Sequence, residues 1–142
     1  VVGHEKEAEL IMKYVMTEAV APEGMALLNQ GEKVYVAHDA NPANYTEEMK
    51  DADVVVTGEG CLDYQTAMGK APVGVAKLGK KYGAKTIAFA GSVTKEAVAC
   101  NEAGIDAFFP IVRGISTLEE AMDPDTAKVN MAAAAEQVFR LL

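Results

Sequence analysis

The sequence predicts an α/β fold in which helices flank a parallel β-sheet. From residue 53 onward, short apolar runs alternate with helix-length segments, as in repeated strand–helix–strand units. The apolar runs show no polar–apolar alternation, which is typical of strands covered on both faces. With 142 residues, half of them apolar, the chain can bury the core of a single domain.

The residue patterns in the first third of the chain predict two helices and one strand. Residues 5–20 carry apolar side chains at steps of three and four, which indicates an amphipathic helix that ends before Pro22. Residues 33–37 (K-V-Y-V-A) indicate a short strand, and residues 45–50 a brief helix.

The first regular unit is a strand over residues 53–57 followed, after a glycine-rich stretch, by a helix over residues 72–82. Pro72 stands near the first helical position, and a glycine lies just past the predicted end. Gly74 and Gly79 each weaken this helix by about 1 kcal/mol relative to alanine. We expect close packing of the helix on the sheet to compensate for that loss.

The second unit is a strand over residues 86–90 and a helix over residues 95–103. Thr94 is in position to cap this helix, and a glycine follows its end. A third strand is predicted over residues 107–112. Because Pro110 lacks a backbone donor, this strand should lie at an edge of the sheet or end early.

Two more helices are predicted at the end of the chain. Residues 116–119 (S-T-L-E) form a capping-box pattern that starts a short helix reaching about residue 122. Asp123 and Pro124 are typical of the start of a last helix over residues 125–142. The apolar positions expected to form its buried stripe are Val129, Ala132, Ala133, Val138 and Leu141.

The composition argues against several classes of partner. The formal net charge of −8 disfavours nucleic acid and anionic membrane surfaces, because both attract clustered Lys and Arg. No apolar run is long enough to span a membrane. Cys61 and Cys100 show neither metal-ligand nor disulfide spacing, which favours a cytoplasmic location. The first residues lack both an initiator Met and a signal-peptide pattern, so we expect a piece of a longer protein.

Ligands of parallel sheets bind beyond the carboxyl ends of the strands, which selects the loops over residues 58–70, 91–95 and 113–116. The first loop is the most polar. It fits neither common nucleotide fingerprint, because Asp63 stands where a third glycine is needed and Ala71 where Ser or Thr would hold Mg²⁺. Its candidate site residues are Gly58, Glu59, Gly60, Asp63, Gln65, Thr66, Gly69 and Lys70.

The charged residues of this loop suit phosphoryl transfer. Of Glu59 and Asp63, one could accept a proton from a substrate hydroxyl and the other bind a metal ion; alternatively, both are solvated loop acids. Lys70 precedes a helix N-terminus, where an ammonium and the helix dipole together favour phosphate or carboxylate. The plainer alternative for Lys70 is a surface lysine.

The neutral residues suit a small hydroxylated ligand. Gln65 and Thr66 offer hydrogen bonds to a polyol or hydroxy acid, or else serve loop and cap bonding. Ser92 could add a phosphate contact. Cys61 is either a thiolate nucleophile, with His38 as its base, or a packing residue. The histidines show no metal-ligand spacing, so no residue is assigned as a metal ligand from spacing.

Read as a whole, G-E-G-C-L-D-Y-Q-T-A-M-G-K-A-P resembles the signature of bacterial glycerate kinases of the first class, G-E-G-R-[IL]-D-x-Q-T-x-x-G-K-x-P. The segments I-A-F-A-G-S and A-G-I-D-A-F-F-P-I follow in the family's order. The resemblance covers residues 51–142, and residues 1–50 have no placed counterpart. The chain departs from the family in Cys61, where the family usually has Arg, and in lacking an N-terminal D-S-F-K motif.

The resemblance implies the C-terminal portion of a cytoplasmic glycerate kinase, which uses ATP and Mg²⁺ to phosphorylate a hydroxyl of D-glycerate to phosphoglycerate. It implies a flavodoxin-like or Rossmann-like three-layer domain whose site lies in a cleft between two domains. Glu59, Asp63 and Lys70 would be catalytic, and the other candidates would bind substrate or phosphate. The alternatives are a non-catalytic small-anion or nucleotide-binding module and an inert structural piece. A sheet edge left exposed by missing strands would favour a homo-oligomer.

Overall fold

The protein is described by a computed structural model over residues 34–36 and 49–142. The helix predicted over residues 5–20 and most of the helix predicted over residues 45–50 lie outside the described residues. The strand predicted over residues 33–37 is confirmed in its middle, as β1 (Val34–Val36).

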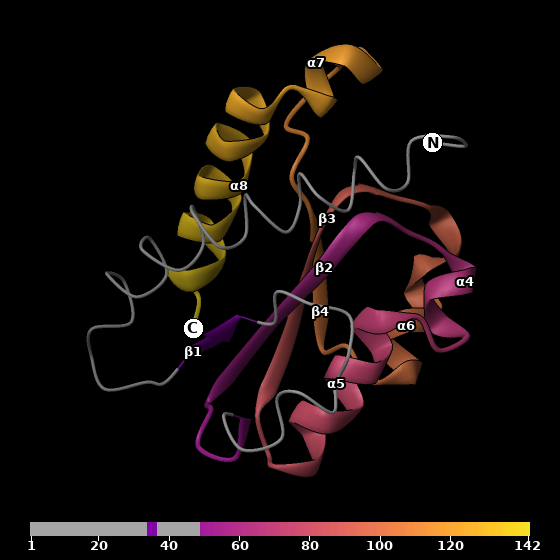
Figure 1. Cartoon of the computed structure of the whole chain (residues 1–142), viewed down its shortest axis with the longest axis vertical. Helices are drawn as coiled ribbons and strands as arrows, with labels where there is room; N and C mark the ends of the chain where they lie inside the picture. Colours follow the sequence, from indigo (N-terminus) through magenta and orange to yellow (C-terminus); the bar gives the residue numbers. More distant parts are fainter. Residues whose placement is uncertain (1–33, 37–48) are drawn as a thin grey trace.

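Among the described residues, the sheet has four parallel strands in the order β1-β2-β3-β4. The three longer ones are β2 (Val54–Leu62), β3 (Lys85–Val93) and β4 (Ala107–Pro110). Figure 1 shows β2 and β3 running side by side through the centre of the molecule. The predicted parallel sheet is therefore confirmed.

Helices cover both faces of the sheet, because side chains along each strand alternate between the faces. On one face, Val56 of β2 and Phe89 of β3 join a buried cluster with Met131 of α8 (Pro124–Phe139). On the other face, Val55 and Val75 share a cluster, with Val75 on α5 (Ala71–Lys81). In Figure 1, α8 and α5 accordingly lie on opposite sides of the sheet, which gives the three layers of an α/β domain.

Both central strands are longer than predicted. We expected strands over residues 53–57 and 86–90, but each has nine residues and continues through the glycines that follow. The second half of β2 remains paired with β3, with Glu59 opposite Ala90 and Cys61 opposite Ser92. The backbone hydrogen bonds of a neighbouring strand thus override the weak strand preference of the residues Gly58–Gly60.

The predicted helix over residues 72–82 is α5, which begins at Ala71 with Pro72 in its first turn. Gly83, just past its end, has a φ of +80°, a conformation that favours glycine. A Cβ on Gly79 would lie 2.9 Å from Thr86 Oγ1 and 3.3 Å from Val55 Cγ2. The expected close packing on the sheet is therefore confirmed at Gly79.

The predicted helix over residues 95–103 consists of a 3₁₀ turn, η3 (Lys95–Val98), followed by α6 (Ala99–Ala103), and it stops at Gly104 with a φ of +126°. The expected side-chain cap by Thr94 is wrong. In the tight 3₁₀ turn the Thr94 carbonyl accepts from Ala97 N–H at 3.2 Å, while the buried Thr94 hydroxyl has no partner among the described residues.

The strand with Pro110 behaves as predicted: β4 lies at an edge of the described sheet and ends at Pro110, two residues before the predicted end. The capping box is real but starts one residue later than predicted. Thr117 caps α7 (Leu118–Met122), and Glu120 completes the box by accepting from Thr117 N–H at 2.9 Å. Thr117 and Glu120 have the three-residue spacing that the box requires.

The last helix, α8, begins at Pro124, one residue before the predicted start, with Asp123 as its cap. It ends at Phe139 and buries a stripe that shares only Val138 with the predicted one. Val129 and Leu141, expected inside, are 65% and 84% exposed. Five side chains are buried, of which only Val138 was predicted: Ala127, Met131, Ala135, Val138 and Phe139. In so alanine-rich a helix the apolar face is weakly marked, so packing on the sheet decides which face is buried. No helix in the described part of the chain is both long and apolar enough to cross a membrane.

Replacing Asp123 with alanine should destabilise the fold in a pH-dependent way. Asp123 Oδ2 accepts from Thr126 N–H at 2.8 Å and from its hydroxyl at 2.7 Å, and the pKa of Asp123 is lowered, chiefly by the Thr126 backbone hydrogen bond. A lowered native-state pKa stabilises the fold fully above the ordinary value of 3.8 and progressively less as the pH falls through the lowered pKa. The difference in Tm between parent and Asp123→Ala should therefore be present at pH 6 and shrink below pH 3.8.

Thermal melts followed by circular dichroism from pH 2 to pH 7 measure this difference. Asp125→Ala is the matched control, because Asp125 lies in the same first turn without holding the cap. A parent-to-Asp123→Ala difference in Tm that stays constant over the whole pH range would contradict the prediction.

Candidate functional site

The candidate site lies at the carboxyl edge of the sheet. Because every strand pairing is parallel, β2, β3 and β4 all end at this edge, as the ligand rule for parallel sheets requires. After β2 the chain turns into a one-turn helix, α4 (Tyr64–Ala67), which the sequence did not indicate, and then enters α5. Figure 1 shows α4 at this edge, close to the end of β3.

Asp63 holds α4 in place. Its Oδ1 accepts from Gln65 N–H at 2.8 Å and from Thr66 N–H at 3.1 Å, the geometry of an N-cap. In return, Asp63 N–H donates to Thr66 Oγ1 at 3.2 Å. Among the described residues, every contact of this carboxylate falls on Oδ1, which leaves Oδ2 available to a ligand.

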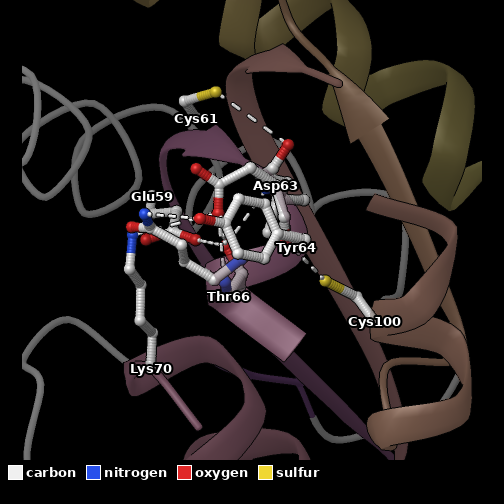
Figure 2. A network of polar contacts seen from close by, with 9 residues as sticks. Glu59, Cys61, Asp63, Tyr64, Thr66, Lys70 and Cys100 are labelled. Carbon is white, nitrogen blue, oxygen red and sulfur yellow. Dashed lines mark hydrogen bonds and ion pairs between the residues drawn. The ribbon is translucent and has the colours of Figure 1, made fainter. Parts of the chain in front are cut away.

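Thr66 links the two acidic residues. Its hydroxyl donates to Glu59 Oε1, so the carboxylate at the end of β2 is tied to the helix that Asp63 caps. Thr66 is fully buried, with 0% of its surface exposed. Figure 2 shows Glu59, Asp63 and Thr66 gathered in one polar network. The structure thus brings together the two carboxylates that the sequence paired only by their spacing.

Lys70 completes the charged cluster. Its Nζ lies 3.9 Å from Asp63 Oδ1, and the two side chains are 43% and 25% exposed, so both remain open to solvent. Lys70 is also the residue that precedes α5, whose first turn contains no acidic residue. In Figure 2 its side chain extends towards Asp63 and Glu59. One ammonium beside two carboxylates leaves the cluster with a net negative charge, which suits a bound cation as well as a substrate proton.

The neutral candidates lie around this cluster. Gln65 is exposed, and its Nε2 donates to the Tyr64 hydroxyl at 3.3 Å. Ser92 is exposed on β3, opposite Cys61 of β2. Gly69 has a φ of +112° in the exposed turn between α4 and α5. These positions face solvent at the same edge of the sheet. Gly58 and Gly60, expected in a loop, lie within β2 instead.

The two cysteines have different environments. Cys61 is half-buried, with its Sγ 3.9 Å from Leu62 O, and His38, its suggested base, lies outside the described residues. Cys100 is fully buried, and its Sγ donates to Asp63 O at 3.8 Å. Burial raises the pKa of the Cys100 thiol, and the negative charges of Glu59 and Asp63 raise it further. Cys100 therefore supports the site as a protonated thiol.

Sequence reasoning missed Cys100 and Tyr64 as parts of this site. Cys100 follows Asp63 by 37 positions and carries no motif, so only the packing of α6 under α4 could bring it there. Tyr64 offers its hydroxyl beside Gln65 and is 55% exposed. The signal that could have found Tyr64 was its place in the polar stretch, where we assigned the site to the neighbouring residues only.

The loop over residues 113–116, the third loop selected from the sequence, supports the start of α7. Ser116 Oγ donates to Glu120 Oε2 at 3.2 Å, which supports the cap of α7. In the described part of the chain, the hydrogen bonds of Ser116 lie at the start of α7. That part of the chain also holds no group of three His, Cys, Asp or Glu side chains able to bind a metal ion.

Comparison with known proteins shows which family the chain matches. The model of the family described as "Glycerate kinase family" matches residues 25–142. The chain is 49% identical to a glycerate kinase of Halalkalibacterium halodurans over 63% of its own length and 24% of the relative's. It is 39% identical to a glycerate 2-kinase of Escherichia coli K12 over 68% of its length and 26% of that enzyme's. The matched region thus spans about a quarter of these curated relatives.

Proposed function

The chain belongs to the glycerate kinase family, and we propose that it provides the phosphoryl-transfer edge of a glycerate kinase. The reaction is the ATP-dependent phosphorylation of a hydroxyl of D-glycerate to phosphoglycerate. The observation that supports this proposal is the cluster of Glu59, Asp63 and Lys70 at the carboxyl edge of a parallel sheet. Phosphoryl transfer depends chiefly on positioning and charge stabilisation, which such a cluster can supply.

In this proposal one of the two carboxylates orients the glycerate hydroxyl and accepts its proton as the oxygen attacks the γ-phosphorus of ATP. The bond from that phosphorus to the bridging oxygen of ADP breaks as the new bond forms. Both carboxylates remain candidates for the base. Asp63 has a free Oδ2, whereas the Glu59 carboxylate is oriented by the Thr66 hydroxyl.

Lys70 has the complementary role. Its ammonium, together with the positive end of the dipole of the 11-residue α5, would stabilise negative charge on the transferring phosphoryl group. Such local positive charge lets an anionic substrate bind to a chain whose formal net charge is −8. We assign the remaining polar contacts with substrate or phosphate to Gly58, Gly60, Gln65, Gly69 and Ser92.

The residues present fit Mg²⁺, the ion that kinases of this type use. Mg²⁺ is usually held by one or two carboxylates together with substrate phosphates and water, and it does not need a cage of protein ligands. Glu59 and Asp63 meet that requirement, although the described residues offer no three-ligand cluster. Bound there with ATP, the ion would neutralise phosphate charge.

A coupled assay of ADP release with D-glycerate and Mg-ATP tests the proposed function in the complete gene product that carries this sequence. Calorimetry with each ligand, run on the same sample, separates the alternatives. Turnover supports the kinase. Binding without turnover supports the second candidate, a small-anion or nucleotide-binding module, which is favoured by Cys61 at the position where the family usually has Arg. The absence of both binding and turnover would overturn both candidates.

We also propose a homo-oligomer in the cytoplasm. The edge strand β4 has a free side in the described sheet, and such edges favour association with a second chain. Light scattering should give the mass of a dimer or larger, and a monomer mass would contradict this. The cytoplasmic location is supported by two cysteines that are both free thiols.

A further inference from the structure

Thr66 has an unusual place in the site, because it is polar, central and completely buried. It is the one buried residue of α4, with 0% of its surface exposed, whereas its neighbour Gln65 is exposed. Sequence reasoning placed Thr66 among the groups that touch substrate. A side chain that solvent does not reach suits a role behind the contact surface better.

The hydroxyl of Thr66 is already committed within the protein. A threonine hydroxyl has a single proton to donate, and this one goes to Glu59 Oε1. The same oxygen accepts Asp63 N–H at 3.2 Å. The other acceptor in reach, Asp63 Oδ1 at 3.4 Å, is farther away than Glu59 Oε1, so the hydroxyl proton is directed to Glu59. The donor that could have met a substrate is therefore used to hold a carboxylate.

Thr66 is supported from behind through Asp63. Asp63 Oδ1 caps α4 from one end, and Cys100 Sγ contacts Asp63 O from below. Threonine is β-branched, so few χ1 rotamers are open to it once its methyl group is packed. Glu59, by contrast, has three rotatable side-chain bonds and is only half-buried on β2. The bond from Thr66 therefore restricts the more mobile of the two groups.

We propose that Thr66 is a positioning residue, whose hydroxyl holds the Glu59 carboxylate in the orientation in which it meets the substrate. The inference rests on the proposed kinase function. Thr66 acts through Glu59 and touches neither glycerate nor ATP. Loss of the hydroxyl should then lower kcat while leaving substrate affinity nearly unchanged, because misplacement of a catalytic group by about 1 Å can cost about 10²-fold in rate.

The test compares Thr66→Val, which keeps the shape and removes the hydroxyl, with Thr66→Ser, which keeps the hydroxyl, in the complete gene product. We expect Thr66→Val to lower kcat about 10- to 100-fold with the KM for glycerate within about twofold, and Thr66→Ser to restore most of the rate. Thr126→Val is the matched control, because it removes an exposed threonine hydroxyl from the cap of α8, away from the site.

A double-mutant cycle separates positioning from a purely structural role. If Thr66 acts through Glu59, Thr66→Val should cost less than about twofold in kcat when Glu59 is already alanine, which cannot accept the hydroxyl proton, whereas a structural role costs the same in both backgrounds. Thermal melts check that each variant folds. If the valine variant does not fold, Thr66→Ala replaces it in the cycle.

The outcomes are distinct. An active parent with unchanged kcat in Thr66→Val overturns the inference, as does a raised KM with unchanged kcat, which would indicate direct substrate contact. A serine variant as impaired as the valine variant also overturns it. An inactive parent instead overturns the proposed kinase function, and the inference with it, before any variant is compared.

Discussion

Replacing Asp63 with asparagine is expected to lower kcat for ATP-dependent glycerate phosphorylation by about 10²- to 10⁴-fold, the range for loss of a general acid–base group. The substitution removes the charge and keeps the shape. Asparagine is as good an N-cap as aspartate, so its Oδ1 should still accept from Gln65 N–H and Thr66 N–H. The ion pair between Lys70 and Asp63 disappears, and the free oxygen Oδ2 becomes an amide that can neither accept a proton nor bind a cation.

The measurement is the coupled kinase assay on the complete gene product, with circular dichroism to show that the fold is intact. Asp106→Asn is the matched control. Asp106 likewise accepts from a backbone donor, Thr86 N–H at 2.8 Å, and pairs with a lysine, Lys80 at 3.5 Å, but it lies after α6 and away from the carboxyl edge. Unchanged turnover in Asp63→Asn would remove Asp63 from the catalytic groups and leave Glu59 as the candidate base.

Replacing Gly91 with alanine is expected to destabilise the fold by about 1–3 kcal/mol, the usual cost of overpacking a well-packed core. A Cβ at this position would lie 2.8 Å from Gly60 O, closer than a real Cβ contact. Both groups belong to paired strands, so neither can rotate away, and β2 and β3 would have to separate beside Glu59. We therefore expect a loss of catalytic rate in addition to the loss of stability.

Urea unfolding of the chain measures the loss of stability, as a lower midpoint at unchanged slope. Gly114→Ala is the matched control, because a Cβ there would have no atom within 4 Å and the residue has no left-handed backbone conformation. If Gly91→Ala and Gly114→Ala unfold at the same midpoint, the close approach of the two strands carries no stabilising role.

The predicted fold and site agree with the structure where they depend on sequence patterns that act over a few neighbouring residues. The parallel sheet and the helix α5 follow from apolar runs and from the proline and glycine at the helix ends, which act within a few residues. The stop of β4 at Pro110 follows from a missing donor. The burial of α8 does not follow in this way, because many alanines leave several faces of similar hydrophobicity.

By itself, the sequence determined the fold class and the polar stretch that carries Glu59, Asp63 and Lys70, because residue type and spacing act locally along the chain. Only the tertiary structure decided how that stretch is built. The pairing of β2 with β3 extends the strand through residues 58–62, and the buried hydroxyl of Thr66 ties Glu59 to the cap of α4. Cys100 reaches Asp63 from 37 positions away. These contacts join residues whose neighbourhood depends on packing and backbone pairing, which no local pattern encodes.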